Sequence, residues 1–353
     1  MGKIQTNLRL LVICFIIPLC SIGQIENTSK KLGKVSKLFK TSKILPIQME
    51  YSNRDLKKLT NDSTYLNINL TYMDVDTLST LPLRIRARGN FRRKNCYFSP
   101  VKMKIKKDDA KKTLFKGNKE LKLVLPCLKV KNANDDVIKE LLAYKLYEVV
   151  SPYHFKTRLL DFTLSESKGK RIEKHRIKAF FIEDMDELED RFGGKSMKRN
   201  VHPLQQDSLN SIRNAFFQYM IGNTDFSTGY QHNQKLLFLN GFSIPIPYDF
   251  DMSGLCDTSY SVVSQIDGLV LPLESVTDRL YRGFIRSNAL MFSIRDEFLQ
   301  NQSNMMAILE DHKAYFENPD EYEKSKEYIL GFFDILADSD KFKSEILDNR
   351  RDK

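Results

Sequence analysis

The sequence predicts an α+β protein of two lobes, with a strand-rich lobe at residues 46–183 followed by a helical lobe at residues 184–353. From about Pro46 to Cys127, short runs alternate apolar and polar residues, as half-buried antiparallel strands do. Beyond Glu183, apolar residues recur at helical spacing. A chain of 353 residues, 41% of them hydrophobic, is long and apolar enough to bury a sizeable core.

The first lobe is expected to hold strands around one helix. Apolar residues alternate at 66–72, 83–87, 101–105 and 121–125, and two further strand-like runs cover 157–164 and 176–183. Between these groups, Asn134 can cap a helix whose apolar residues recur at i, i+4 and i+7. Ser151-Pro152 ends that helix, because proline cannot continue it.

The second lobe is expected to begin near residue 184 and to be mainly helical. Helical patterns cover 184–193 and 207–222, the second with Ser208 as a possible cap, and amphipathic segments follow from Ser275 onward. Between them, residues 222–254 read as a β-hairpin-like segment rich in acidic residues. This segment is the most informative part of the chain.

The N-terminus has the pattern of a secretory signal. Lys3 and Arg9 precede the apolar run 10–19, and small residues precede Gln24. We therefore expect a signal peptide at 1–23, a basic arm at 24–45 and an exported chain, periplasmic or extracellular. A lipoprotein anchored at Cys20 is the alternative. The apolar run is shorter than the roughly 20 residues that span a bilayer.

The cysteines fit export. Cys96, Cys127 and Cys256 remain after removal of the signal, and an oxidising compartment would allow one pair to form a disulfide. Cys96 and Cys127 are the expected pair, because both lie in the same predicted sheet. No spacing of cysteines and histidines indicates a zinc site.

The formal charge of +11 is concentrated in two basic blocks. Residues 29–43 hold six lysines and no acid, and we read them as a solvated arm, with peripheral membrane contact left open. The second block, from Arg86 to Lys107, surrounds a glycine turn between strands, where it can neutralise bound phosphates. Nucleic acid is not an expected partner.

The acidic segment 222–254 holds the residue types that phosphoryl transfer requires. A carboxylate must orient the attacking hydroxyl, while an Asn oxygen and a second carboxylate hold a divalent metal. Asp225, Asn233 and Asp249 fit these roles in that order. The alternative is that these residues form turns, since Gly222-Asn223 and Asn240-Gly241 are turn dipeptides. The run IPIPYDFD favours a site, because it places two carboxylates at the end of an otherwise buried strand.

Two motifs resemble the CotH family of spore-coat-type secretory kinases. RGNFRRKNCYFSPVKMKIKK resembles the family's Arg-Gly-Asn turn and lysine-bearing strand, and GNTDF…HN…PYDFD resembles its catalytic and metal segments. The resemblance covers roughly residues 80–260 and is more specific in its second half. It implies a two-lobed protein-kinase-like fold, with a strand-rich N-lobe and a helical C-lobe, that binds ATP with Mg²⁺ or Mn²⁺.

The resemblance also implies a nucleotide site in the first lobe. The turn Arg88, Gly89 and Asn90 would cover the phosphates, and Lys102 or Lys104 would bind them. Periodicity cannot separate these two lysines, because they share one face of a strand; Lys102 is preferred. Two acids would complete the site. Glu140 would pair with the lysine, although a glutamate on the helix surface is the commoner interpretation. Glu183 would end the strand that meets the adenine, although its side chain could also cap a turn.

In the second lobe, Asp225 would be the catalytic carboxylate and Asn233 and Asp249 metal ligands. Asp251 is either a second ligand or a hydrogen-bonding partner of the Ser253-Gly254 turn. Protein kinases commonly separate the catalytic Asp and the metal-binding Asn by about five positions, so the larger gap here requires an enlarged loop. His232 could act as a base, but packing or hydrogen bonding is the favoured interpretation.

We therefore expect an exported kinase that transfers a phosphoryl group from a metal-bound nucleotide to a protein or other envelope acceptor. A nucleotidyltransferase with the same metals is one alternative, and a non-catalytic envelope-binding module is another. Arg279 and Arg282 could meet a phosphate or an acidic partner, although a pair of arginines on a helix surface is the default interpretation.

Overall fold

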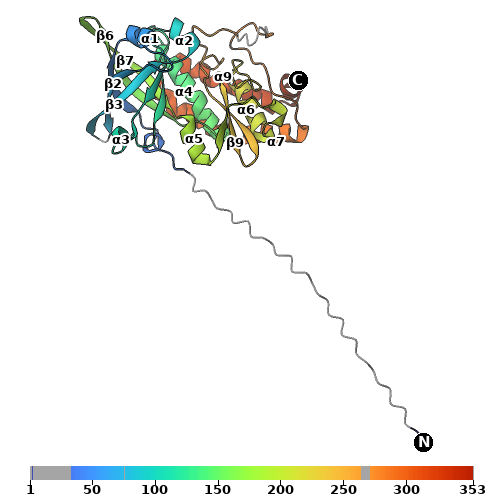
Figure 1. Ribbon diagram of the computed structural model, residues 1–353. Coiled ribbons are helices and arrows are strands. Elements are labelled where there is room, and N and C mark those ends of the chain that lie inside the picture. Colours follow the sequence, from blue (N-terminus) through green and yellow to red (C-terminus); the bar gives the residue numbers. More distant parts are fainter. Residues whose placement is uncertain (1, 3–32, 75, 264–270, 353) are drawn as a thin grey trace. The chain divides into compact units, whose positions relative to one another are not determined.

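The computed structural model describes residues 2, 33–74, 76–263 and 271–352 (Figure 1). Leu32–Lys353 form one compact unit. The predicted signal peptide, with Cys20, lies outside the described residues apart from residue 2. None of the helices in the described ranges has the length and apolar character needed to cross a membrane.

Seven strands close into a barrel in the order β1-β2-β3-β4-β5-β7-β6. Neighbouring strands are antiparallel except β1 and β6, which pair in parallel from Leu45 opposite Leu160. Alternate apolar residues point inward, so that Ile85, Met103 and Leu121 are buried in the barrel core. The strands are β1 (Leu45–Tyr51), β2 (Leu66–Asp74), β3 (Thr77–Ala87), β4 (Val101–Lys104), β5 (Glu120–Val124), β6 (Thr157–Lys168) and β7 (Arg171–Ile182).

The predicted two-lobed, protein-kinase-like fold, with a strand-rich N-lobe and a helical C-lobe, is wrong. The structure is a closed seven-stranded mixed barrel with helices. Alternation shows which side chains face a core but not which strands are neighbours, so it did not reveal that β1 pairs with β6 and closes the sheet. The proposed helical part also holds a three-stranded antiparallel sheet, made of β8 (Lys195–Met197), β9 (Gln234–Leu239) and β10 (Phe242–Pro247).

The helices belong mostly to a second buried core, outside the barrel. Residues Asn240-Gly241, both at positive φ, turn the chain between β9 and β10 as the sequence indicates. The helices are α1 (Asn53–Leu59), α2 (Asn90–Asn95), α3 (Lys107–Ala110), α4 (Ala133–Val150), α5 (Met185–Phe192), α6 (Ser208–Met220), α7 (Asn288–Gln300), α8 (Gln302–His312), α9 (Pro319–Ala337) and α10 (Ser339–Phe342). Short helical turns cover Lys37–Phe39, Pro203–Gln205, Lys313–Tyr315 and Lys343–Leu347.

Helix α4 connects the two cores. It packs against β6 and β7 and also against α6 and α8 (Figure 1). Asp135 in its first turn accepts hydrogen bonds from the backbone amides of Glu317 and Asn318, at 2.7 and 3.1 Å. The helix ends before Ser151-Pro152, as predicted. Its predicted cap, Asn134, instead accepts a hydrogen bond from the amide of Lys178, while Asn132 occupies the capping position.

Candidate functional site

The acidic residues of segment 222–254 and the Arg-Gly turn line one cleft of about 370 Å³. The turn lies between β3 and α2, and the acidic residues follow α6 and β10. Among the lining residues are the predicted Arg88, Gly89, Asp225, Asn233, Asp249 and Asp251. Residues from positions far apart in the chain therefore meet at one site.

Asp225 lies in a loop that follows α6, and this loop also positions Asn233. The Asn233 side-chain nitrogen donates to the Asp225 carbonyl at 2.6 Å and to its carboxylate at 2.9 Å. The eight-residue separation is accommodated by a turn in which the Ser227 amide donates to the His232 carbonyl. The His232 ring is hydrogen-bonded to the Asp225 carboxylate at 3.2 Å, in agreement with the favoured interpretation.

A hydrogen-bonded chain of buried amide side chains holds the loop that carries Asp225. Asn223 donates to Gln218 at 2.9 Å, Gln218 to Asn214 at 3.4 Å, and Asn214 to Gln234 at 2.8 Å. All four are buried, and an unmade bond there would cost roughly 1–3 kcal/mol. The chain of amides thus joins α6 and β9 to the loop that carries Asp225. Sequence reasoning missed it, although Asn214 and Gln218 stand four residues apart and therefore lie on one face of α6.

Asp249 lies two residues beyond the end of β10 and is held by α4. Its backbone amide donates to the Tyr144 hydroxyl at 2.9 Å, and the next residue, Phe250, packs against the Tyr144 ring. Asp249 has a φ of 66° and Asn233 a φ of 51°. Such left-handed conformations cost on the order of 1 kcal/mol or more and concentrate at functional sites. The Asp249 carboxylate is partly exposed and lies 4.0 Å from the Arg88 guanidinium.

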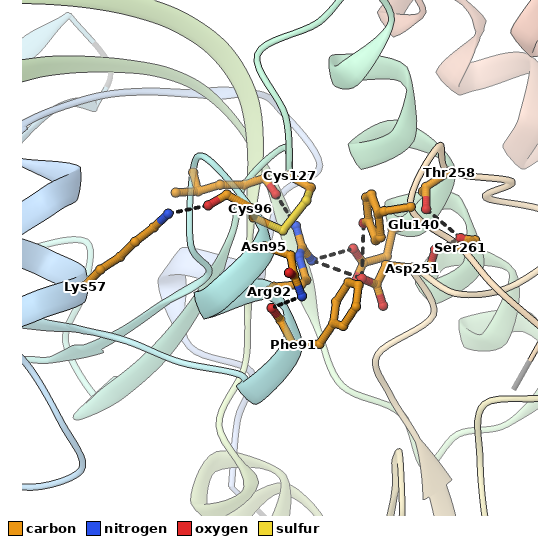
Figure 2. The surroundings of a disulfide bond; sticks show 12 residues. Lys57, Phe91, Arg92, Asn95, Cys96, Cys127, Glu140, Asp251, Thr258 and Ser261 are labelled. Atoms are coloured by element: carbon orange, nitrogen blue, oxygen red, sulfur yellow. Dashed lines mark hydrogen bonds and ion pairs between the residues drawn. A yellow bond between two sulfur atoms is a disulfide. The ribbon is translucent and has the colours of Figure 1, made fainter. Parts of the chain in front are cut away.

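Asp251 is more deeply buried and is paired with Arg92 (Figure 2). The Arg92 guanidinium lies 3.5 Å from the Asp251 carboxylate and 3.7 Å from that of Glu140. Tyr260 also donates to Asp251, at 3.1 Å. Among the described residues, the Asp251 carboxylate contacts Arg92 and Tyr260 and not the Ser253-Gly254 turn. The predicted hydrogen bond to that turn, one of two predicted roles for Asp251, is therefore not seen.

The buried carboxylates have shifted proton affinities. Burial raises the pKa of Asp251 to about 6; Arg92 opposes the rise and Asp249 adds to it. Burial and the charge of Asp251 raise the pKa of Glu140 well above its ordinary value, against the pull of Arg92. One guanidinium therefore stabilises two neighbouring carboxylates.

The helix that carries Arg92 is tied down by the predicted disulfide. Cys96 and Cys127 are bonded, which confirms the expected pair, and Cys256 is a buried free thiol. Figure 2 shows the disulfide beside Arg92, which also donates to the carbonyl of Leu125. Arg92 is thus anchored to the barrel on one side and faces the carboxylates on the other.

The expected pairing of Glu140 with Lys102 is not present. Lys102 and Lys104 instead pair with Glu120, at 2.5 and 3.3 Å. Glu140 reaches Arg92, as described above. The three residues of β4 and β5 lie on the outer face of the barrel, where the strand register sets Lys104 opposite Glu120.

Lys122 is the lysine near the cleft that sequence reasoning missed. The register places it beside Lys102 on the outer face, and its amine lies 4.9 Å from the ring centre of Tyr248 and 5.3 Å from that of Phe155. Burial lowers its pKa to about 8; Arg88 adds to the fall, while negative neighbours that include Asp249 oppose it. The run Leu121-Lys122-Leu123 shows the same alternation as β4, but only the fold shows which lysine packs on Tyr248, the residue before Asp249.

The remaining predicted residues divide between the turn and the structural core. Gly89 has a φ of 76°, which glycine adopts without strain. Asn90 begins α2, but its side chain lies outside the described residues. The Glu183 side chain is buried in an ion pair with Arg191, at 2.7 Å, and accepts from the amide of Lys156. It fixes the chain between β7 and α5, close to the predicted capping role.

A second group of potential metal ligands lies away from the cleft. The ligand atoms of Glu166, Glu173 and His175 lie within 4.8 Å of one another. Lys129 and Lys168 pair with Glu173 and hold its pKa at about 2. The charge that a cation would balance is therefore already balanced within the protein.

In comparisons with known proteins, no protein-family model and no curated protein sequence matches this chain. The resemblance to CotH-type kinases stays a prediction. The function is argued below from the site itself.

Proposed function

We propose that this protein transfers a phosphoryl group from a metal-bound nucleoside triphosphate, with ATP the expected donor, to a hydroxyl group of a protein or other envelope acceptor. The observation that carries the proposal is that Asp225, Asn233 and Asp249 line one cleft together with Arg88. Phosphoryl transfer requires little covalent chemistry from the protein. It depends on positioning the groups and on offsetting negative charge.

The donor atoms of the cleft suit Mg²⁺ or Mn²⁺. Asp249 offers a partly exposed carboxylate, and the Asn233 nitrogen is turned toward Asp225, which leaves its amide oxygen as a ligand. Hard divalent cations prefer such oxygen ligands. Asp251 offers a further carboxylate, but Arg92 already neutralises part of its charge. Asp249 and Asn233 would therefore hold the metal, with Asp251 as a supporting charge.

The residues of the cleft divide the remaining tasks. Asp225 accepts the proton of the acceptor hydroxyl, whose oxygen forms a bond to the γ-phosphorus while the bond to the β,γ-bridging oxygen breaks. The nucleoside diphosphate leaves with that electron pair. Arg88 and Lys122 offset the charge of the phosphates. A divalent cation held by Asp249 and Asn233 would offset part of the negative charge of the phosphates.

The disulfide and the N-terminal sequence support an envelope acceptor. A disulfide between Cys96 and Cys127 is typical of proteins in oxidising compartments, and the N-terminal sequence is typical of a signal peptide. We therefore place the reaction in the periplasm or outside the cell.

Labelled nucleotides test the proposal with the purified mature chain. Transfer of label from the γ-phosphate to an acceptor fraction is expected, and it should require Mg²⁺ or Mn²⁺. Label transferred from the α-phosphate would instead identify a nucleotidyltransferase. If calorimetry detects no metal-dependent binding of millimolar ATP, only a binding module with another ligand is left.

Two substitutions separate chemistry from metal binding. Asp225→Asn should leave metal-dependent ATP binding nearly intact and lower transfer by roughly 100-fold or more, as loss of a catalytic acid or base does. Asp249→Asn should weaken both, because it removes a metal ligand. Asp161→Asn is the matched control, since Asp161 pairs with Lys178 at an exposed site on the barrel. Equal and mild effects of all three changes would contradict the assignment.

A further inference from the structure

A buried arginine from a distant segment holds the backbone on both sides of Asp225. One terminal nitrogen of Arg282 donates to the carbonyl of Thr224 and, at 3.1 Å, to that of Phe226. Only 8% of Arg282 is exposed, and its guanidinium lies 5.3 Å from the centre of the Phe226 ring. The interpretation of Arg282 as a helix-surface residue is therefore wrong.

These bonds complete the support of the Asp225 backbone. The Asp225 amide donates to the Asn223 side chain at 3.0 Å, and the Asp225 carbonyl accepts from Asn233. Arg282 donates to the carbonyls of Thr224 and Phe226, the residues before and after Asp225. The two peptide groups that flank Asp225 are thus fixed in orientation, and this limits where the Asp225 carboxylate can point.

The segment that carries Arg282 is itself held at a second place. The Arg351 amide donates to the Gly283 carbonyl at 2.9 Å, and the Arg351 carbonyl accepts from Ile285 at 2.8 Å. The Arg351 guanidinium lies 4.2 Å from the centre of the Phe284 ring. The backbone that carries Arg282 is therefore held in place, whereas the side chain of a surface arginine would keep its freedom of rotation.

We propose that Arg282 is a positioning residue for Asp225, which acts through the 224–226 backbone and does not contact the substrate. The inference rests on the proposed role of Asp225 in phosphoryl transfer. It predicts that loss of the guanidinium lowers turnover and leaves nucleotide and metal binding largely unchanged. A displacement of a reacting group by about 1 Å can cost about 100-fold in rate.

The test compares Arg282→Lys with a matched control, Arg295→Lys. Arg295 also donates to two backbone carbonyls, those of Leu336 and Ala337, and its guanidinium lies 5.0 Å from the centre of the Phe342 ring. It makes the same kinds of contact away from Asp225. Arg282→Lys should lower kcat by about 10- to 100-fold with the KM for ATP changed less than about twofold. Arg295→Lys should leave both constants unchanged.

Hydrogen–deuterium exchange gives a readout that does not depend on activity. Amides of residues 222–233 should exchange several-fold faster in Arg282→Lys than in the wild type, and the Arg295→Lys protein should keep the wild-type rates there. If the wild type transfers no phosphoryl group, the proposed function fails, and the exchange rates still decide whether Arg282 orders the loop. Unchanged exchange in Arg282→Lys, or an unchanged kcat in an active enzyme, would overturn the inference.

A second variant covers the case in which Arg282→Lys does not fold. Arg351→Ala removes the side chain that packs on Phe284 but leaves Arg282 in place. Amides of residues 222–233 should again exchange faster than in the wild type, but by a smaller factor, because the backbone that carries Arg282 is held less firmly. Exchange at the wild-type rate in a folded Arg351→Ala protein would count against the proposal.

Discussion

Removal of the disulfide should lower the stability of the protein without dismantling the site. The change is Cys96→Ser with Cys127→Ser. The bond joins the C-terminal end of α2 to the residues that follow β5 and closes a loop with a sequence separation of 31. The amides of Tyr97 and Phe98 also donate to the Cys127 carbonyl, at 2.7 and 3.3 Å, so backbone bonds still join the two segments after the change.

The magnitude follows from the size of the closed loop. For a loop of this length, the chain-entropy estimate is a loss of about 3.7 kcal/mol in the free energy of unfolding at 25 °C. Residual structure in the unfolded chain makes this an upper value. For a unit of this size the change corresponds to a fall in Tm of about 5 °C.

Urea unfolding with and without a reducing agent measures the effect. The wild type should lose about 2–4 kcal/mol on reduction, while the double variant should start at the lower stability and not respond to the reducing agent. Cys256→Ala, which changes the buried free thiol, should keep the response. A wild type whose unfolding midpoint is the same in both conditions, or a non-reducing digest without a linked Cys96–Cys127 peptide, would refute the reasoning.

Two further predictions concern Lys122 and the N-terminus. Because the folded pKa of Lys122 is about 8, below its ordinary value of 10.5, its acylation rate should rise through a midpoint near pH 8. ATP with Mn²⁺ should move that midpoint upward, since added negative charge favours the protonated amine; a midpoint near 10.5 that ATP does not shift would contradict its place in the site. Mass spectrometry of the exported chain should find a start near Gln24. An intact Met1 from a cytoplasmic fraction would contradict export, and a lipid on Cys20 would favour the lipoprotein alternative.

The sequence predicted the strands better than their arrangement. Alternation located segments of β2 to β7, because one face of each strand packs into an apolar core. It could not show that β1 pairs with β6 in parallel, since pairing across more than 100 residues leaves no local mark. The same limit applies to the lysine that is expected to bind the phosphates. Lys102 and Lys122 face the same side of the barrel, and only the fold shows that Lys122 packs on Tyr248, the residue before Asp249, while Lys102 pairs with Glu120.

The cleft was more predictable than the fold because its main residues belong to local motifs. The sequence itself shows a buried strand followed closely by Asp249, and an Asp and an Asn on one loop, whatever the order of the strands. The supporting residues are not local. Arg282 lies 58 residues from Thr224 in the Asp225 loop. Arg92 pairs with Asp251 from α2, which lies between β3 and β4. The sequence suggests a surface position for Arg282 and a phosphate-binding block for Arg92, and the role of each arginine follows only from the carbonyls or carboxylates that the fold brings to it. Substitutions at these arginines should therefore separate the geometry of the cleft from its chemistry more sharply than changes to the acidic residues themselves.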